Sequence, residues 1–306
     1  MGSEMCIRDS NSIPTTPSNF LALPPVQSDI DTASIVILPV PYDSTTSFRA
    51  GSREGPGAII EASAALEDYD LEMDLDVAGL GIYTAPVLEP HLGSPELNVE
   101  RVSQAVSCFL APNKLVGVIG GEHSITAGSV LAHKEVYPDL SVLYLDAHCD
   151  LRDEYMGTRW GHASGGRRIH DVCSVVFVGL RSMCEEERDY IRLASRDDGY
   201  NSIATFACPI SDPQLLARDV IEKLNDTVYV SVDLDVFDPS LMASVGTPEP
   251  GGMDWYQVVG LIKSVAEKRH IVGFDVCELA PREGPSACSY TAAKLVYKLI
   301  AYSVGR

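Results

Sequence analysis

The sequence predicts an α/β fold in which helices cover both faces of a mostly parallel β-sheet. Apolar runs rich in β-branched residues, such as Ser34–Val40 and Val172–Leu180, are typical of strands buried on both faces. Segments with helical spacing of apolar residues follow most of these runs, and this alternation indicates a parallel sheet. The 306 residues, of which 45% are hydrophobic, suffice for a large core.

Proline and turn residues help to place the individual elements in order along the chain. We expect strands at Ser34–Val40, Val77–Tyr83, Lys114–Ile119, Val142–Leu145, Val172–Leu180, Ile203–Pro209, Thr227–Phe237 and Ile271–Glu278. We expect helices at Pro56–Leu66, Pro95–Leu110, Ser124–Tyr137, Glu185–Ser195, Pro213–Leu224, Asp254–Glu267 and Cys288–Val304. Ser94 and Ser124 are the expected N-caps of two of these helices, and Leu151–Gly165 is an expected loop.

The first 28 residues show no clear pattern of strand or helix. Met1–Ser10 resembles a leader or a sequence artefact, and the polar Asn11–Ser28 is expected to be a flexible or surface-wrapped arm. We therefore divide the chain into residues 1–28 and a single domain over residues 29–306. The N-terminus lacks an apolar signal segment and no run is long enough to span a membrane, so the expected location is cytoplasmic.

Charge and cysteine usage limit the classes of partner. A formal charge of −20 argues against nucleic acid and anionic membranes as partners. It is compatible with a cationic substrate, although a surface selected for solubility is the favoured interpretation. The eight cysteines are scattered without a CxxC pair, which is typical of reduced thiols in a cytosolic protein.

A group of alternating acidic and imidazole side chains follows one of the predicted strands. Asp146, His148 and Asp150 come directly after Val142–Leu145, and alternate residues of an extended strand share one face about 6–7 Å apart. Cys149 would then point to the opposite face, and we interpret it as a packing residue. Such a group is costly to bury without a counter-charge, so we expect a divalent metal ion; a solvated loop is the alternative.

Two further segments carry matching ligands. Asp233 and Asp235 lie two residues apart near the end of another predicted strand, and His123 lies at a strand-to-helix turn in Gly120–Ser124. The six predicted metal ligands are His123, Asp146, His148, Asp150, Asp233 and Asp235. Four carboxylates and two imidazoles suit Mn²⁺, although zinc or iron also accept these ligands. Six ligands exceed the need of one tetrahedral ion and fit two ions about 3.5–4 Å apart.

These motifs resemble those of the ureohydrolase family, the binuclear manganese enzymes that include arginase and agmatinase. The sequences GGEHS, DAHCD and SVDLDVFDP occur in the family's order, within Gly120–Ser124, Asp146–Asp150 and Ser231–Pro239. The resemblance extends to Pro41–Ser47, Gly246–Gly252 and Phe274–Glu278 and covers roughly residues 35–305. It implies a three-layer α/β/α sandwich with a mostly parallel central sheet, two Mn²⁺ ions and a homo-oligomer, usually a trimer or hexamer.

The resemblance also implies roles for three residues near the metal ions. Glu278 would bind a planar guanidinium through paired charge-assisted hydrogen bonds. Asp150 would bind metal and accept a hydrogen bond from the attacking hydroxide. His162 would transfer a proton to the departing amine. Many family members have Ser-His here, whereas this chain has Gly161-His162, which could alter a local hydrogen bond.

The substrate is expected to be a small cationic guanidino compound. Asp150–Tyr155 resembles agmatinases, and the Asn that arginases place shortly after this metal stretch is missing. We therefore expect hydrolysis of agmatine to putrescine and urea. Guanidinobutyrate or guanidinopropionate is the runner-up, followed by arginine. A metal-binding homologue without activity and a deacetylase of related architecture are less favoured hypotheses.

Overall fold

The structure, a computed structural model, describes residues 15–195 and 201–305. Its centre is an eight-stranded sheet whose strands run in the order β4-β1-β5-β10-β9-β6-β7-β8. The strands are β1 (Ile35–Val40), β4 (Ile82–Thr84), β5 (Leu115–Gly120), β6 (Ser141–Leu145), β7 (Ser174–Leu180), β8 (Ile203–Ala207), β9 (Thr227–Asp233) and β10 (His270–Cys277). Every pair of neighbours in this sheet is parallel, which confirms the predicted mostly parallel sheet.

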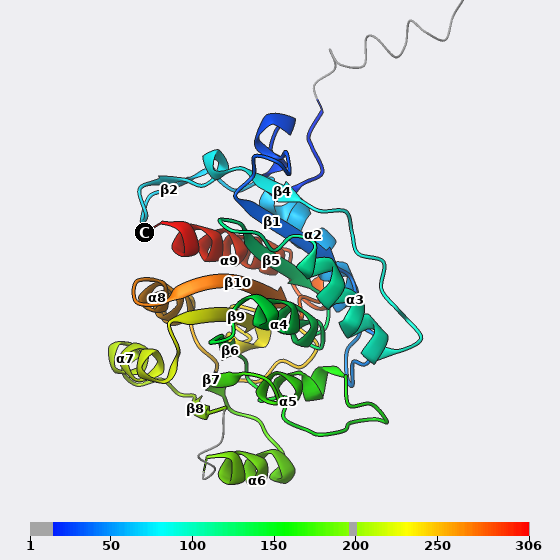
Figure 1. The fold of residues 1–306 in the computed structure, drawn as a ribbon, viewed down its shortest axis with the longest axis vertical. Coiled ribbons are helices and arrows are strands. Elements are labelled where there is room, and N and C mark those ends of the chain that lie inside the picture. The colour runs from blue at the N-terminus through cyan, green and yellow to red at the C-terminus, as the bar shows by residue number, and fades with distance from the viewer. Residues whose placement is uncertain (1–14, 196–200, 306) are drawn as a thin grey trace, which may run out of the picture.

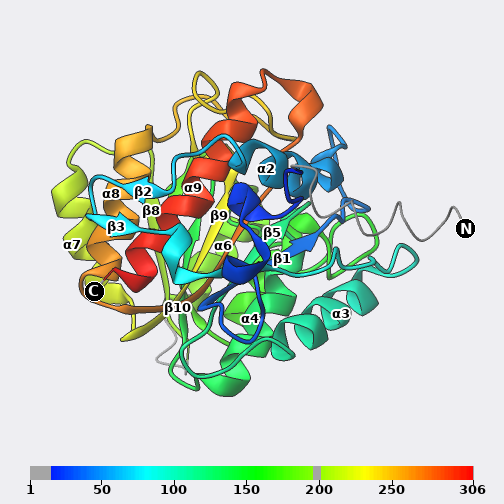
Figure 2. The same ribbon diagram turned by 90° about the horizontal axis from the view of Figure 1, so that it is seen from above.

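Helices cover the sheet on both faces, as Figures 1 and 2 show. One layer consists of α2 (Gly55–Ser63), α7 (Pro213–Lys223), α8 (Trp255–Ala266) and α9 (Ala287–Val304). The other contains α3 (Pro95–Ser107), α4 (Ile125–Val136) and α5 (Gly165–His170), with α6 (Glu185–Ala194) contributing Tyr190 and Ile191 to the apolar packing there. The result is the expected three-layer α/β/α sandwich.

Burial explains why the strands read as continuous apolar runs. All residues of β1, β5 and β6 are buried, because side chains on both faces of a parallel sheet meet helices. Phe20 and Leu23 are buried in the core as well, although they lie in the range expected to be an arm. Met1–Ser10, the expected leader, lies outside the described residues. Among the described residues, no helix is long and apolar enough to cross a membrane.

The structure corrects several predicted element boundaries. Within Val77–Tyr83 the chain makes a 3-10 turn at Ala78–Leu80, and only Ile82–Thr84 forms a strand. The strand predicted at Thr227–Phe237 ends at Asp233, followed by a 3-10 turn. Three short elements were not predicted, namely α5 and the two strands β2 (Tyr69–Asp70) and β3 (Leu75–Asp76), which form an antiparallel pair. Their shortness leaves no periodicity in the sequence to detect.

Helix capping was predicted correctly at one of two positions. Ser94 accepts a hydrogen bond from the backbone N–H of Leu97, with Pro95 in the first turn of α3. Ser124 does not cap α4; its hydroxyl instead donates to the carboxylate of Glu122 at 2.6 Å. The sequence shows this acceptor two residues earlier, but it does not show that the carboxylate of Glu122 is buried and requires donors.

The topology brings the predicted ligand segments to one edge of the sheet. Strands β5, β10, β9 and β6 are consecutive neighbours, although they are far apart in the sequence. Because they are parallel, their carboxyl ends meet at the same edge, where open α/β sheets form their binding sites. The segments with His123, Asp146, Asp233 and Glu278 leave the sheet there.

Candidate metal centre and active site

The first half of the site forms around the buried imidazole of His123, three residues after β5. Its Nδ1 atom lies 2.9 Å from Asp146 Oδ2 and 3.5 Å from one oxygen each of Asp150 and Asp233. The phenol oxygen of Tyr144 lies 2.9 Å from both His123 Nδ1 and Asp150 Oδ2. One ring nitrogen thus faces several oxygen atoms in a small volume.

The second half lies on the other side of Asp146. His148 Nδ1 lies 3.0 Å from Asp235 Oδ2 and 3.5 Å from Asp146 Oδ1. The backbone N–H of Ala147 donates to Asp235 Oδ1 at 3.0 Å, and that of Asp235 donates to Asp233 Oδ1 at 2.8 Å. These backbone donors orient the carboxylates before any ion binds.

These contacts define two candidate metal positions that share one carboxylate. His123, Asp146 and Asp233 form one group with ligand atoms within 4.8 Å of one another, and Asp146, His148 and Asp235 form another. Asp150 faces the first group through its contact with His123. The structure therefore brings all six predicted ligands together, and a shared Asp146 suits a pair of adjacent ions.

The local electrostatics also fit cationic occupants. Burial and the neighbouring carboxylates of Asp235 and Asp150 raise the pKa of Asp146 to about 6. Burial and the charges of Asp235 and Asp146 raise the pKa of Asp233 well above its usual value. Although burial opposes its charged form, hydrogen bonds to Asp146 and Asp235 raise the pKa of His148 to about 12. Buried carboxylates this close repel one another, and divalent cations would relieve that repulsion.

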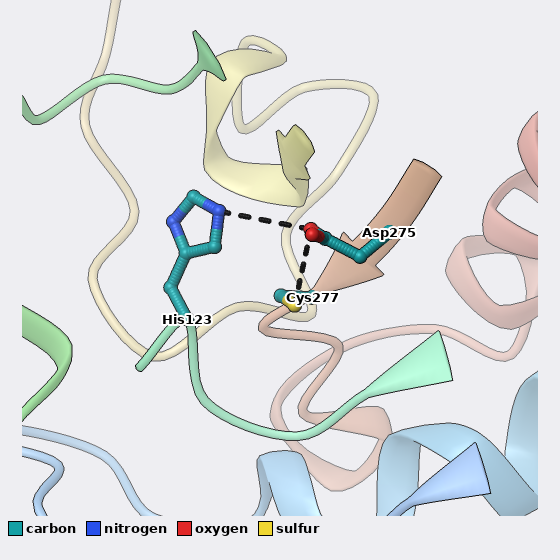
Figure 3. A group of neighbouring side chains, drawn as sticks. All are labelled: His123, Asp275 and Cys277. Atoms are coloured by element: carbon teal, nitrogen blue, oxygen red, sulfur yellow. Dashed lines mark hydrogen bonds and ion pairs between the residues drawn. The ribbon is translucent and has the colours of Figure 1, made fainter. Parts of the chain in front are cut away.

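The far side of His123 is supported by a hydrogen-bonded chain that the sequence analysis did not identify. His123 Nε2 lies 2.8 Å from Ser231 Oγ, which donates to Asp275 Oδ1 at 2.8 Å. Figure 3 shows His123, Asp275 and Cys277 together, with Asp275 4.0 Å from Nε2 and the Cys277 thiol donating to Asp275 at 3.6 Å. Because the Ser231 hydroxyl donates to Asp275, Ser231 accepts from Nε2–H, and Nδ1 is the ring atom that would bind a metal ion.

Two carboxylates of the site have an unusual backbone conformation. Asp150 has φ of 50° and Glu278 has φ of 69°, in the left-handed region that residues other than Gly seldom adopt. Glu278 directly follows β10, and its Oε1 accepts from the backbone N–H of His123 at 2.8 Å. Backbone strain of this kind tends to be retained at functional sites. Burial and the nearby charge of Glu122 raise the pKa of Glu278 to about 8.

His162 approaches the site from the loop after the metal stretch, at the start of a 3-10 turn. Its backbone N–H donates to Thr45 Oγ1 at 3.0 Å, and its ring atoms Nδ1 and Nε2 lie 3.3 Å from Thr45 Oγ1 and 3.1 Å from Ser47 Oγ. Burial lowers the pKa of His162. The ring is therefore held by the N-terminal loop, a contact that the sequence did not indicate.

A cavity of about 260 Å³ joins these groups. Its lining includes the predicted site residues His123, His148, Asp150, His162, Asp233 and Glu278. It also includes Phe48, Arg49, Arg152, Tyr155, Glu187 and Thr247. Phe48 is 71% exposed and thus lies toward the opening. Four of the six predicted ligands, together with His162 and Glu278, therefore face one space.

Several predictions about the surroundings need correction. β6 ends at Leu145, so Asp146, His148 and Asp150 lie on a loop and not on a pleated strand. Cys149 is nevertheless a packing residue, fully buried in an apolar cluster. Asp153, which belongs to the agmatinase-like stretch Asp150–Tyr155, is paired with Arg159 at 2.7 Å and Arg168 at 2.6 Å.

Other contributors to the site were missed because only tertiary structure brings them there. They are Thr45, Glu122, Tyr144, Glu187, Ser231 and Asp275. The sequence did contain one signal, since Glu122 is an acidic residue directly beside a predicted ligand. The others resemble ordinary strand or loop residues.

Comparison with known proteins agrees with this geometry. The model of the Arginase family matches residues 33–301. An N(1)-aminopropylagmatine ureohydrolase of Synechocystis is 35% identical over 300 residues, covering 95% of this chain and 96% of the relative. One from Thermus thermophilus is 39% identical, covering 88% of this chain and 89% of the relative. An agmatinase of Pyrococcus horikoshii is 34% identical, covering 90% and 94%.

Solved structures agree as well. The agmatine ureohydrolase of Thermoplasma volcanium aligns with a TM-score of 0.83 and 29% identity, covering 97% of this chain and 98% of that one. The chain belongs to the arginase family. Within that family it is a ureohydrolase, and thus a hydrolytic enzyme.

Proposed function

We propose that this ureohydrolase holds two Mn²⁺ ions and hydrolyses the guanidinium group of agmatine to putrescine and urea. His123, Asp146 and Asp233 would hold one ion with Asp150, and Asp146, His148 and Asp235 would hold the other. When bound, such an ion pair supplies positive charge and lowers the pKa of water toward neutrality. The mixture of carboxylates and imidazoles without a thiolate supports manganese.

The placement of Glu278 carries the proposal. Its buried carboxylate faces the same cavity as the metal groups, and one oxygen is fixed by the backbone N–H of His123. A guanidinium has parallel N–H groups that match a carboxylate, and such charge-assisted pairs give both affinity and orientation. Glu278 would therefore position the guanidinium carbon beside the metal groups, which lowers the entropic part of the barrier.

The remaining steps are proton transfers by residues of the chain. Asp150 would accept a hydrogen bond from the attacking water and fix its direction. Attack at the guanidinium carbon and cleavage of its bond to the alkylamino nitrogen release urea and an amine, and His162 would protonate that nitrogen as it leaves. His162 lines the same cavity as Asp150 and Glu278, which supports this assignment.

A second substrate is favoured by a separate observation. The relatives at 35% and 39% identity are named for N(1)-aminopropylagmatine, which carries an aminopropyl group on the amine end of agmatine. Both compounds share a guanidinobutyl group and a cationic tail. Glu187 also lines the cavity; its two oxygens accept from the backbone N–H groups of Leu151 and Cys184, and its negative charge favours such a tail. Arg49 and Arg152 also line it and would suit a carboxylate tail, so guanidinobutyrate is the competing class.

A substrate panel tests the proposal. The purified protein is loaded with Mn²⁺ and offered agmatine, N(1)-aminopropylagmatine, guanidinobutyrate, guanidinopropionate and arginine at equal concentration, and urea is measured. We expect release from agmatine or its aminopropyl derivative. Release from guanidinobutyrate alone would overturn the substrate, and bound metal without urea from any compound would indicate an inactive homologue.

A matched variant tests the role of Glu278. Glu278→Gln keeps the size of the side chain and removes its charge, so we expect kcat/KM to fall roughly 10- to 100-fold, as for a lost hydrogen bond to a charged group. Metal content should be unchanged. The homo-oligomer and the cytoplasmic location stay predictions, which light scattering and cell fractionation can test.

A further inference from the structure

The polar residues around His162 form a chain that leads to a second buried carboxylate. Glu122 is fully buried and lies one residue before His123. Its Oε2 accepts from the backbone N–H of Thr45 at 2.7 Å, and its Oε1 accepts from the hydroxyls of Thr45 at 2.5 Å and Ser124 at 2.6 Å. Each of these contacts to Glu122 is made by a donor, so both of its oxygens act as acceptors.

The proton of the Thr45 hydroxyl determines what His162 can do. A threonine hydroxyl has one proton and two lone pairs, and here the proton is donated to Glu122. The oxygen can therefore only accept from His162. It accepts the backbone N–H at 3.0 Å, and the ring atom Nδ1 at 3.3 Å must carry a proton to bond to it. The neutral ring then has its lone pair on Nε2, the atom beside Ser47.

Gly161 makes room for this arrangement. A Cβ atom at position 161 would lie 3.1 Å from Thr45 Oγ1 and 3.3 Å from Thr45 Cβ. It would also lie 3.1 Å from Thr158 Cγ2. A side chain here would therefore push against Thr45, the residue that holds His162. Glycine at position 161 therefore leaves free the space next to the side chain of Thr45.

We propose that Glu122 and Thr45 are positioning residues that fix both the place and the tautomer of His162. They hold the proton on Nδ1 and leave Nε2 as the nitrogen that exchanges a proton with the departing amine. The protons balance as follows: Nε2 of the neutral ring takes a proton from water, Nε2–H gives that proton to the amine nitrogen as the bond to the guanidinium carbon breaks, and the ring returns to the neutral form with Nδ1–H bonded to Thr45. This inference depends on the proposed role of His162 in the ureohydrolase reaction.

A double-mutant cycle on the Mn²⁺-loaded enzyme tests it. Thr45→Val removes the hydroxyl at nearly constant shape, and we expect kcat to fall about 10- to 100-fold with KM within roughly twofold. Thr45→Ser keeps the hydroxyl and should keep kcat within about threefold. In a His162→Asn background, Thr45→Val should cause less than about a twofold further loss, because residues that act as one unit are not additive.

The outcomes separate this inference from the proposed function. The positioning role would be overturned if the decrease in kcat of the double variant equalled the product of the decreases in Thr45→Val and His162→Asn. Equal decreases in Thr45→Val and Thr45→Ser would overturn it as well, and either result would leave His162 as proton donor. No loss for His162→Asn, with normal urea release by the unchanged protein, would instead remove the donor role of His162.

A second variant keeps the test decisive if Thr45→Val does not fold. Gly161→Ala places a methyl group against Thr45 without removing any polar atom, and we expect kcat to fall several-fold with unchanged KM. The loss should again disappear in the His162→Asn background. An undiminished loss in that background would count against the proposal.

Discussion

At the scale of single residues, Tyr144 shows how the sheet supports the site. Its ring stacks on His123 at 4.4 Å between centroids, and its hydroxyl donates to Asp150 at 2.9 Å. Tyr144→Phe keeps the ring and removes the hydroxyl, with its contacts to Asp150 and to His123 Nδ1. Because partners that orient metal ligands typically contribute 10- to 100-fold to metal affinity, we expect Mn²⁺ affinity to fall about tenfold, measured by calorimetric titration.

A matched control for this change exists elsewhere in the chain. Tyr302 is also buried, and its hydroxyl donates to Glu72 at 2.8 Å, away from the cavity. Tyr302→Phe should leave metal affinity unchanged and lower the free energy of unfolding by about 1 kcal/mol. Equal metal affinity in Tyr144→Phe and the unchanged protein would show that the hydroxyl of Tyr144 does not support Asp150.

The same scale shows what sequence alone can and cannot predict. All six proposed ligands converge because acidic and imidazole residues at strand ends are conspicuous, and parallel strands bring those ends together. Their local geometry was predicted wrongly, since Asp150 has a positive φ on a loop. Glu122 and Thr45 were missed because their contact joins residues 77 positions apart. No periodicity records such a contact.

At the scale of secondary-structure elements, close packing of α3 against α4 depends on Gly128. A Cβ at this position would lie 2.4 Å from the backbone oxygen of Val99 and 2.9 Å from Val102 Cβ. Gly128→Ala should therefore lower the free energy of unfolding by about 1–3 kcal/mol, because the backbone of α3 must move. Denaturant titration measures the change.

Gly57 in α2 provides the matched control for that substitution. A Cβ there would meet nothing within 4 Å. Gly57→Ala should stabilise the protein by about 0.5–1 kcal/mol, since alanine loses less backbone entropy in a helix. Similar effects of the two substitutions would contradict the proposed dependence on close helix packing.

The β2–β3 pair gives an element-scale prediction for pH. Glu72 lies between these strands and receives hydrogen bonds from Lys263, Lys298 and Tyr302. Although burial opposes ionisation, the bonds from Lys298 and Lys263 lower the pKa of Glu72 to about 2 from its ordinary value of 4.5. Because the pKa of Glu72 is lower in the folded protein than in the unfolded chain, its ionisation stabilises the folded protein fully at pH values above 4.5. This contribution to stability is lost as the pH falls from 4.5 toward 2.

The difference in stability between the unchanged protein and Glu72→Gln should therefore be larger at pH 6 than at pH 3. Urea denaturation at both pH values measures it. A constant difference would show that ionisation of Glu72 does not stabilise the docking of this hairpin on α9.

At the scale of the whole molecule, the fold was the most predictable feature. Apolar runs alternate with helical patterns over the whole domain. A local error, such as the strand predicted over the whole of Val77–Tyr83, therefore does not change the predicted architecture. The strand order was not predictable from these patterns. The order depends on which crossovers the helices make. Strands β5 and β6, for example, follow one another along the chain, but β10 and β9 lie between them in the sheet.

That strand order predicts a structural role for bound metal ions beyond the site. The ligands follow β5, β6 and β9, so each bound ion ties together segments from separate parts of the sheet and neutralises buried carboxylates. An ion at 100 times its Kd stabilises the folded state by about 2.7 kcal/mol, which for a domain of this size raises Tm by on the order of 4 °C per site.

We expect EDTA to lower Tm by several degrees and excess Mn²⁺ to restore it. Asp235→Ala should lose about half of the rise produced by Mn²⁺, because it disrupts one group and leaves the group around His123 intact. A Tm that is the same with Mn²⁺ and with EDTA would mean that these carboxylates do not hold ions in the folded protein.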